Sequence, residues 1–414
     1  MCATSSVANG WTGARATGMA CRERLQLMNL VVISHAYQDE RYLSTLESVA
    51  GHPGITVTLI HPKKYMGETS VRTALSTIHD IPVSVFFGSR QGTFIYHPRG
   101  LANALDQARP DVILHEQEVY ALSAGQVALA AAKRSVPLVL FVWENVRRSL
   151  AMPRRVLRRY VLAKASGVIA GSVQAMQVHR DWGFRGGTAV IPQMGAAANT
   201  NPVYGRRDRA ILRMCFVGRL VPCKGVECLL RAIEDLRRRG LSVSCTVAGQ
   251  GPALPQFKAI AQQLGIQNRI VFCGQLSADA VQSLLRVSDV LVLPSRRTDV
   301  WQEQFGLVLT EAMAEATVAV GSRTGAIPEV IGSDNLLFDD GNVRGLADIL
   351  ERLACDPHFY IDCQHLLWKR ARDIYSFEQL AAQRVQFLRG IVAHSRAHCP
   401  EELAVGEHFE LRIR

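Results

Sequence analysis

The chain has 414 residues, of which 48% are hydrophobic and 20% charged, values typical of a globular protein long enough for two domains. Its formal net charge of +11 is placed unevenly, because eight Lys or Arg residues and no acid lie between Arg147 and Arg180. No apolar run reaches the length of about 20 residues that a membrane-spanning helix needs. No recognised nucleic-acid-binding motif or aromatic platform accompanies the basic residues, so we expect no nucleic-acid partner.

The ten cysteines form no CxxC pair and do not cluster with histidine, which disfavours a disulfide framework and a metal site. Cys215, Cys245 and Cys273 stand in apolar, strand-like runs, where cysteine behaves as a small hydrophobe. This cysteine usage favours a protein of the reducing cytoplasm. Within the cytoplasm, the protein is expected free in solution or on the inner face of the membrane. We expect neither a metal nor another cofactor.

Residues 1–28 are rich in Ser, Thr, Ala, Gly and Arg, contain one acid and lack the apolar centre of a secretory signal. A transit-like segment fits this composition, but we expect a disordered extension, because Met28 directly precedes the first strand-like run. Residues 29–195 alternate short apolar runs with helical patterns, which predicts a parallel sheet covered by helices on both faces. Strands are expected at 30–34, 55–60, 83–87, 111–115, 138–142, 167–170 and 189–192, with helices that include 99–108 and 120–134.

A polar linker is predicted at residues 196–209, which contain Asn-Thr-Asn-Pro. The second domain, residues 210–375, repeats the alternation of strands and helices. A long helix is predicted at 376–395, and the charged tail 396–414 is expected to fray. In the second domain, strands are expected at 212–217, 242–248, 269–273, 290–293, 317–320 and 336–338, with helices that include 224–239, 254–264, 278–287 and 306–315.

Two glutamates, Glu303 and Glu311, stand eight residues apart at the start of a predicted helix. Eight residues is just over two turns, so both carboxylates can lie on one side of the helix, about 12 Å apart along its axis. Phe305, Gly306 and Leu307 would present free backbone N–H groups at the positive end of the helix dipole. The arrangement suits phosphates in the middle and hydroxyls at both sides, which is the shape of a nucleotide-sugar.

A second motif, GRLVPCKG at 218–225, follows a strand-like run and opens a helix. Gly218 allows a sharp turn at the strand end, where Arg219 and Lys224 supply two cations. Cations at a helix start oppose the helix dipole, so we expect them to bind an anion rather than to form an ordinary surface pair. Other strand ends also carry glycine, Gly249 among them, and ligands of open parallel sheets bind at such carboxyl ends.

Together with Gly-Ala-Ile-Pro-Glu at 325–329, these motifs resemble the family-4 retaining glycosyltransferases over roughly residues 29–395. The resemblance implies the GT-B fold, in which two Rossmann-like α/β domains face each other across a cleft and the last helix crosses back onto the first domain. It implies a hexosyltransferase-type enzyme that moves a sugar from a nucleotide-sugar donor to a hydroxyl of a glycan or lipid-linked acceptor. Polysaccharide or glycolipid biosynthesis is the expected setting, with the first domain holding the acceptor and the second the donor.

The resemblance also implies roles for single residues. Arg219 and Lys224 would stabilise the leaving diphosphate, Glu303 would bond sugar hydroxyls, and Glu311 would bond the ribose hydroxyls. The family has no assigned enzyme nucleophile, and the leaving phosphate is proposed to assist deprotonation of the acceptor, so we name no general base. The predicted catalytic residues are Arg219, Lys224 and Glu303, and the predicted donor-binding residues are Gly218, Gly249, Phe305, Gly306, Leu307 and Glu311.

The first domain departs from the family pattern at two strand ends. Residues 34–40 contain no glycine where many members place a glycine-rich loop, and Trp-Glu-Asn at 143–145 stands where many place a histidine that faces the donor sugar. His115 matches a family pattern after the fourth strand. We predict His35, His115 and Glu144 on the acceptor or sugar side of the site, with an ordinary buried histidine as the alternative for both histidines.

Residues 153–164 (PRRVLRRYVLAK) read as a basic helix whose arginines recur at i, i+1, i+4 and i+5. An anionic membrane surface is one partner for such a stripe, and a merely solvated face is the alternative. The predicted stripe consists of Arg154, Arg155, Arg158 and Arg159.

Two other functions share part of this pattern. A nucleotide-sugar epimerase has the same two-domain architecture, but we would not expect it to carry the 218–225 motif and the glutamate pair together. A non-catalytic nucleotide-sugar-binding protein would keep the binding residues, and donor hydrolysis by the purified protein separates it from an enzyme. A dehydrogenase is disfavoured, since no GxGxxG follows an early strand.

Overall fold

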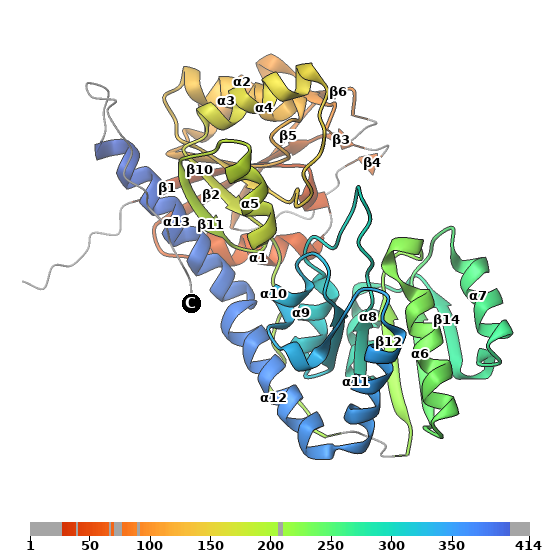
Figure 1. Cartoon of the computed structure of the whole chain (residues 1–414). Helices are drawn as coiled ribbons and strands as arrows, with labels where there is room; N and C mark the ends of the chain where they lie inside the picture. Colours follow the sequence, from red (N-terminus) through yellow and green to blue (C-terminus); the bar gives the residue numbers. More distant parts are fainter. Residues whose placement is uncertain are drawn as a thin grey trace, which may run out of the picture.

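The computed structural model describes residues 27–38, 40–65, 68–69, 77–88, 92–205 and 210–397. Two parallel sheets, each flanked by helices, form two domains that are stacked one above the other in Figure 1. The predicted pair of Rossmann-like domains is therefore confirmed. Most of the predicted extension 1–28 and of the tail 396–414 lies outside the described residues, although Met28 already belongs to the first strand.

The first sheet has seven parallel strands in the order β11-β10-β9-β8-β1-β2-β5. Its central strands are buried on both faces, which is why they read as nearly continuous apolar runs. The strands are β1 (Met28–Ser34), β2 (Ile55–Pro62), β5 (Ile78–Val83), β8 (Val112–Glu116), β9 (Leu138–Val142), β10 (Gly167–Ala170) and β11 (Gly187–Val190).

The strand predicted at 83–87 is wrong. The edge strand of the sheet is β5, which ends where the predicted strand begins, and two short antiparallel pairs, β3 with β4 and β6 with β7, lie outside the sheet. The apolar run suggested a buried strand, but Phe86 and Phe87 are 47% and 70% exposed. The strand β5 mixes apolar residues with His79 and Asp80 and is only partly buried, as an edge strand can be. The remaining first-domain elements are β3 (Lys64–Tyr65), β4 (Glu68–Thr69), β6 (Val85–Phe86), β7 (Ile95–Tyr96), α1 (Glu40–Ala50), α2 (Pro98–Ala108), α3 (Leu122–Lys133), α4 (Met152–Lys164) and α5 (Val173–Asp181).

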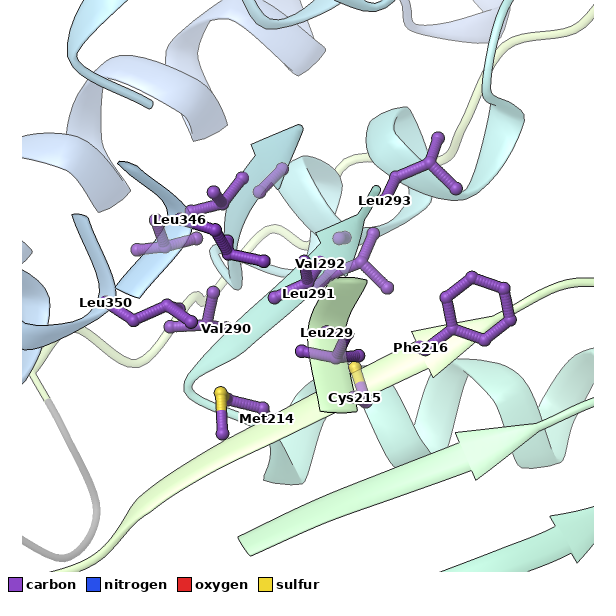
Figure 2. Close-up of a cluster of buried hydrophobic side chains, with 14 of the residues drawn as sticks. Met214, Cys215, Phe216, Leu229, Val290, Leu291, Val292, Leu293, Leu346 and Leu350 are labelled. Carbon is purple, nitrogen blue, oxygen red and sulfur yellow. The ribbon is translucent and has the colours of Figure 1, made fainter. Parts of the chain in front are cut away.

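The second sheet has six parallel strands in the order β14-β13-β12-β15-β16-β17. Figure 2 shows its core, where side chains of β12 and β15 meet Leu229 of α6 and Leu346 and Leu350 of α11. The strands are β12 (Leu212–Val217), β13 (Val243–Ala248), β14 (Ile270–Gly274), β15 (Val290–Leu293), β16 (Val318–Ser322) and β17 (Leu337–Phe338). The helices are α6 (Val226–Arg238), α7 (Leu254–Gln263), α8 (Ala278–Val287), α9 (Leu307–Ala314), α10 (Ile327–Ile331), α11 (Val343–Cys355) and α12 (Pro357–Ile374).

The last helix, α13 (Phe377–Ala397), crosses from the second domain back onto the first (Figure 1). Its apolar face, which includes Leu380, Phe387 and Leu388, belongs to the hydrophobic core of the first domain and packs beside α1. The predicted crossover is confirmed, and the helix continues two residues beyond its predicted end at 395.

One fully buried cation holds α13 to the first domain. Arg384 donates hydrogen bonds to the carbonyl oxygens of Pro192 and Gln193, at 3.2 and 3.1 Å, and its Nη1 lies 3.9 Å from Glu116 Oε1. Glu116 also accepts hydrogen bonds from Tyr37 and Gln193, at 2.9 and 2.8 Å. A charge without solvent needs such partners, so this group ties the crossover helix to the carboxyl end of β8.

We predict that Arg384→Ala lowers the free energy of unfolding by about 3 kcal/mol, because it leaves the buried Glu116 carboxylate without its cation. Urea unfolding followed by circular dichroism measures the change. The control is Gln386→Ala on the exposed side of the same helix, which should stay within about 0.5 kcal/mol of the wild type. Equal stability of the two variants would contradict the role of the buried pair.

Candidate functional site

A cavity of about 580 Å³ opens at the carboxyl ends of the second sheet. Apolar side chains of β12, β15, α8 and α9 form part of its wall, beside Gln275 and Leu276 from the turn after β14. This is the crevice at which open parallel sheets bind ligands. The cavity brings together most of the predicted donor-site residues, namely Gly218, Lys224, Glu303, Gly306, Leu307 and Glu311.

Two residues with separate predicted roles contact each other in this cavity. Lys224 Nζ lies 2.6 Å from Glu303 Oε2, and the Ser295 hydroxyl donates a hydrogen bond of 2.7 Å to the same oxygen. The side chains of Lys224 and Glu303 are only 15% and 9% exposed. The Lys224 ammonium also lies 5.0 Å from the centre of the Trp301 ring, a favourable cation–π position that the sequence did not indicate. An ammonium and a carboxylate are thus presented side by side with little water around them.

Glu303 does not lie on the same helix as Glu311, so the predicted geometry of the glutamate pair is corrected. Helix α9 begins only at Leu307, because Gly306 adopts a left-handed conformation (φ +82°) and the helix does not extend back through it. Glu303 is held instead through its carbonyl oxygen, which accepts a hydrogen bond of 3.0 Å from Ala326 N. A Cβ on the neighbouring Gly325 would lie 1.9 Å from that oxygen, which explains the glycine of the 325–329 motif.

Three predicted donor residues do not line the cavity. Arg219 is exposed. Gly249 (φ +135°) packs behind the wall, where a Cβ would lie 1.9 Å from the carbonyl oxygen of Gly218. The Phe305 side chain is buried, with its ring centre 6.2 Å from that of Trp143 and 5.8 Å from that of Tyr375.

The backbone at the start of α9 fits the predicted anion site. Within the described residues, no acceptor takes the N–H groups of Phe305, Gly306 and Leu307. These groups lie at the N-terminal end of an eight-residue helix, where the helix dipole favours negative charge. The segment therefore remains able to donate to a phosphate.

A second cavity, of about 430 Å³, lies on the first-domain side and is completed by Gln304 of the second domain. Of the three residues predicted on the acceptor or sugar side, His35 and Glu144 line this cavity and His115 does not. The His115 ring is buried, and its Nδ1 lies 2.9 Å from the carbonyl oxygen of Ile33. Burial lowers the pKa of both His35 and His115 to about 4, so both rings are neutral near pH 7.

Sequence reasoning missed a carboxyl group on this cavity, Glu118. Its Oε1 accepts hydrogen bonds of 2.9 Å from the backbone N–H groups of Trp143 and Glu144, while its Oε2 is buried and has no partner within the described residues. Burial raises its pKa to about 7, and the nearby Glu144 carboxylate acts in the same direction. Glu144 itself is engaged by the Tyr120 hydroxyl at 2.8 Å and by Arg148. The only sequence signal was a position two residues after the end of β8.

The four arginines of α4 do not form one exposed stripe, which corrects the prediction. Arg154 lines the second cavity and donates a hydrogen bond of 3.0 Å to the carbonyl oxygen of Tyr120. Arg158 lies 4.7 Å from the centre of the Trp182 ring. Only Arg155 and Arg159 are exposed. Spacing alone placed all four on one side of the helix, but Arg154 and Arg158 lie at the edge of that side and contact the rest of the domain.

The described residues contain no helix that is both long and apolar enough to cross a bilayer. Within the same ranges, no three His, Cys, Asp or Glu side chains gather as metal ligands would. The expectation that the reaction needs no metal stays a prediction.

The sequence matches two family models, one in each domain. Residues 209–367 match the model described as glycosyl transferases group 1, and residues 40–193 match the glycosyl transferase 4-like domain. The chain belongs to the family-4 type of GT-B glycosyltransferases. The first model covers the cavity with Lys224 and Glu303, and the second covers most residues of the cavity with Glu118 and Glu144.

Relatives and solved structures agree with this membership. The alpha-D-kanosaminyltransferase of Streptomyces kanamyceticus is 31% identical over 156 residues, which are 37% of this chain and 39% of that protein. The GDP-mannose-dependent alpha-(1-6)-phosphatidylinositol monomannoside mannosyltransferase of Mycolicibacterium smegmatis is 31% identical over 170 residues, 40% of this chain and 44% of that protein. The alignments thus span less than half the length of these curated relatives.

The whole fold of this glycosyltransferase is shared with solved structures of low sequence identity. Sucrose-phosphate synthase from Thermosynechococcus elongatus superposes with a TM-score of 0.67 at 18% identity, covering 88% of this chain and 99% of that one. HepE of Anabaena, solved in complex with UDP, gives a TM-score of 0.66 at 19% identity, covering 87% and 99%. At this identity the likeness establishes the GT-B fold.

The raised pKa of Glu118 predicts a dependence of stability on pH. Because the pKa rises from 4.5 to about 7 on folding, the folded state retains the proton between these values and loses stability as the pH rises through them. Glu118→Gln cannot ionise, and its amide oxygen can still accept the two N–H bonds. The unfolding free energy of the variant, relative to that of the wild type, should therefore rise by roughly 2–3 kcal/mol between about pH 4.5 and pH 8. Urea unfolding at several pH values checks this, and a pH-independent difference would contradict it.

Proposed function

We propose that this chain is a retaining glycosyltransferase that moves a sugar from a nucleotide-sugar donor to a hydroxyl acceptor. The observation that carries the proposal is the contact of Lys224 with Glu303 on the wall of a cavity that also contains Glu311 and the open N-terminal end of α9. One cavity thereby offers a cation and backbone donors for a diphosphate, with a carboxylate on each side for hydroxyls. HepE, with the same fold, was solved with UDP, which supports a nucleotide-sugar as donor.

The roles of the charged residues follow from this arrangement. When a donor binds, the Lys224 ammonium exchanges its contact with Glu303 for one with the diphosphate. Glu303 then accepts hydrogen bonds from sugar hydroxyls. Glu311 binds the ribose, and Arg219 reaches the diphosphate from the exposed side. The bond between the anomeric carbon and the phosphate oxygen breaks as the acceptor oxygen bonds to that carbon on the same face, and the acceptor proton passes to the leaving phosphate oxygen. Lys224 stabilises the negative charge that grows there.

The acceptor is assigned to the second cavity, where His35, Glu118 and Glu144 supply polar groups and Tyr120 and Trp143 supply ring surface. Such a mixture suits the hydroxyls and the apolar faces of a sugar, so the acceptor is a glycan or a lipid-linked sugar. Polysaccharide or glycolipid biosynthesis in the cytoplasm is the corresponding setting. The mannosyltransferase relative is named for a phosphatidylinositol mannoside, which supports the lipid-linked class.

We predict that Lys224→Ala lowers kcat/KM for the donor by a factor of about 100 or more, because a charge-assisted contact to the leaving group is worth about 2–4 kcal/mol. Purified protein is incubated with UDP-, GDP- and ADP-sugars, and release of nucleoside diphosphate is measured. Lys258→Ala, at an exposed position on α7, is the matched control and should behave as the wild type.

Three outcomes separate the candidate functions in this assay. Hydrolysis or transfer that depends on Lys224 supports the glycosyltransferase. Donor binding without turnover, seen as thermal stabilisation alone, would instead identify a non-catalytic nucleotide-sugar-binding protein. Interconversion of sugar epimers without release of nucleoside diphosphate would identify an epimerase.

The exposed side of α4 supports a second, finer proposal, that the protein docks on the inner face of an anionic membrane. Arg155 and Arg159 are exposed there beside Met152 and Val156, whose side chains are 66% and 57% exposed. Basic and apolar groups on one helix surface are typical of helices that lie on anionic lipid. Such docking would bring the second cavity to a lipid-linked acceptor.

We predict that replacing Arg155 and Arg159 with Gln weakens co-sedimentation with anionic vesicles roughly thirtyfold at low salt, since each basic residue contributes about 1 kcal/mol. High salt should remove the difference by screening. The control replaces the exposed Arg237 and Arg238 of the second domain with Gln and should bind as the wild type. Absence of wild-type binding at low salt would exclude membrane docking and favour a soluble glycan acceptor.

A further inference from the structure

Two buried amide side chains exchange hydrogen bonds across the domain boundary. Gln302 Nε2 donates to the carbonyl oxygen of Asn145 at 2.7 Å, and Asn145 Nδ2 donates to the carbonyl oxygen of Glu303 at 2.9 Å. Gln302 Nε2 also donates to Gln174 Oε1 on α5, at 2.9 Å. Asn145 follows β9 in the first domain, while Gln302 and Glu303 precede α9 in the second. Both amides are nearly fully buried, at 5% and 7% exposed, so solvent does not readily replace these bonds.

Glu303 connects these interdomain hydrogen bonds to the cavity that contains Lys224, and its carbonyl oxygen is the atom involved. It accepts one hydrogen bond from within its own domain, from Ala326 N at 3.0 Å, and a second from Asn145 of the other domain. The side chain of the same residue carries the contact with Lys224. The backbone of Glu303 is therefore fully fixed only when the first domain is in place.

We propose that Asn145 is a positioning residue, which forms with Gln302 an interdomain clamp that sets the Glu303 carboxylate for the donor sugar. The proposal rests on the proposed donor role of Glu303. Asn145 acts through Glu303, because it does not line either cavity. Opening of the domains removes the bonds from Asn145 and leaves Ala326 as the single backbone partner of the Glu303 oxygen.

The clamp links donor binding to closure of the two domains. A donor sugar that holds Glu303 in place also holds the oxygen to which Asn145 bonds, so binding stabilises the closed arrangement. By thermodynamic reciprocity, the closed arrangement raises donor affinity by the same factor. A nucleoside diphosphate without its sugar has no contact with the Glu303 carboxylate and gains little from the clamp.

The test uses Asn145→Asp, which keeps the size of the side chain but replaces the N–H donor with a carboxylate that repels the Glu303 oxygen. Near pH 7.5 we expect donor turnover to fall about tenfold, the effect of one buried hydrogen bond, while affinity for nucleoside diphosphate stays within about threefold. Burial and the facing Glu303 oxygen raise the pKa of the new carboxyl above its ordinary value of about 3.9. As the pH falls toward about 5 it therefore takes up a proton and can donate again, so activity relative to the wild type should recover. A merely structural role would not give this recovery.

The control is Asn342→Asp, the same chemical change at the exposed N-cap of α11, where Asp caps equally well. It should match the wild type at every pH. Gln302→Glu removes the reciprocal donor and should behave as Asn145→Asp does, and the double variant should lose less than the product of the two single losses. Turnover of Asn145→Asp within threefold of the wild type at pH 7.5, or a loss of equal size at pH 5, would overturn the proposal.

A measurement without donor separates failure of the clamp from failure of the proposed function. Hydrogen–deuterium exchange of the Ala326 amide, which donates to the Glu303 carbonyl oxygen, should be at least about tenfold faster in Asn145→Asp than in Asn342→Asp at pH 7.5 in the full chain. Equal exchange in the two variants refutes the clamp whether or not any donor is turned over. If exchange is faster in Asn145→Asp but the wild-type protein uses no nucleotide-sugar, the clamp stands and the donor role of Glu303 is refuted.

Discussion

The position of Glu303 is the constraint on which the rest of the site depends. Its carboxylate pairs with Lys224, and its carbonyl oxygen meets the 325–329 motif and the first domain. A desolvated ion pair contributes little net stability by itself, because the loss of hydration offsets the attraction. In the proposed function its value lies in exchange, since an arriving diphosphate and sugar would supply a new partner for each member. Until then the pair keeps both charges compensated.

The first domain also compensates a buried carboxylate with hydrogen bonds and a cation. Glu116, at the carboxyl end of β8, is satisfied by Tyr37, Gln193 and Arg384. Gln193 in turn accepts a hydrogen bond of 2.8 Å from Trp143 Nε1, and Trp143 packs beside Phe305 of the second domain. A continuous set of polar and ring contacts thus runs from the crossover helix, past the first-domain cavity, to the start of α9. The helix that joins the domains is therefore part of the support of the cleft.

Much of this was predictable from sequence, for a physical reason. Buried parallel strands are nearly continuous apolar runs, so β9, β10, β12 and β15 were placed at their observed bounds. Glycines at strand ends and a paired carboxylate pattern selected residues that line one cavity at the carboxyl ends of the second sheet. The start of α9 was placed one residue early, because Gly306 is compatible with a helix start but adopts a left-handed conformation here.

Other features depend on tertiary contacts that spacing does not encode. Glu118 is unremarkable in sequence, and its pKa is raised because the fold buries its carboxyl group, although two N–H groups after β9 donate to one of its oxygens and partly oppose the rise. Arg154 and Arg155 are neighbours in the sequence, yet one lines a cavity and the other is exposed, since the packing of α4 decides which edge of its basic side faces inward. The pairing of Asn145 with Gln302 joins residues 157 positions apart.

The two cavities differ in the surroundings of their carboxyl groups. In the second domain the Glu303 carboxylate is paired with the Lys224 ammonium. In the first domain Glu118 lies beside Glu144, which engages the nearby Arg148, and burial favours the protonated form of Glu118. A protonated carboxyl donates one hydrogen bond and an ionised one only accepts, so Glu118 can change the hydrogen-bonding character of the first-domain cavity near neutral pH. In the proposed function this cavity holds the acceptor, so Glu118 would make acceptor recognition depend on pH.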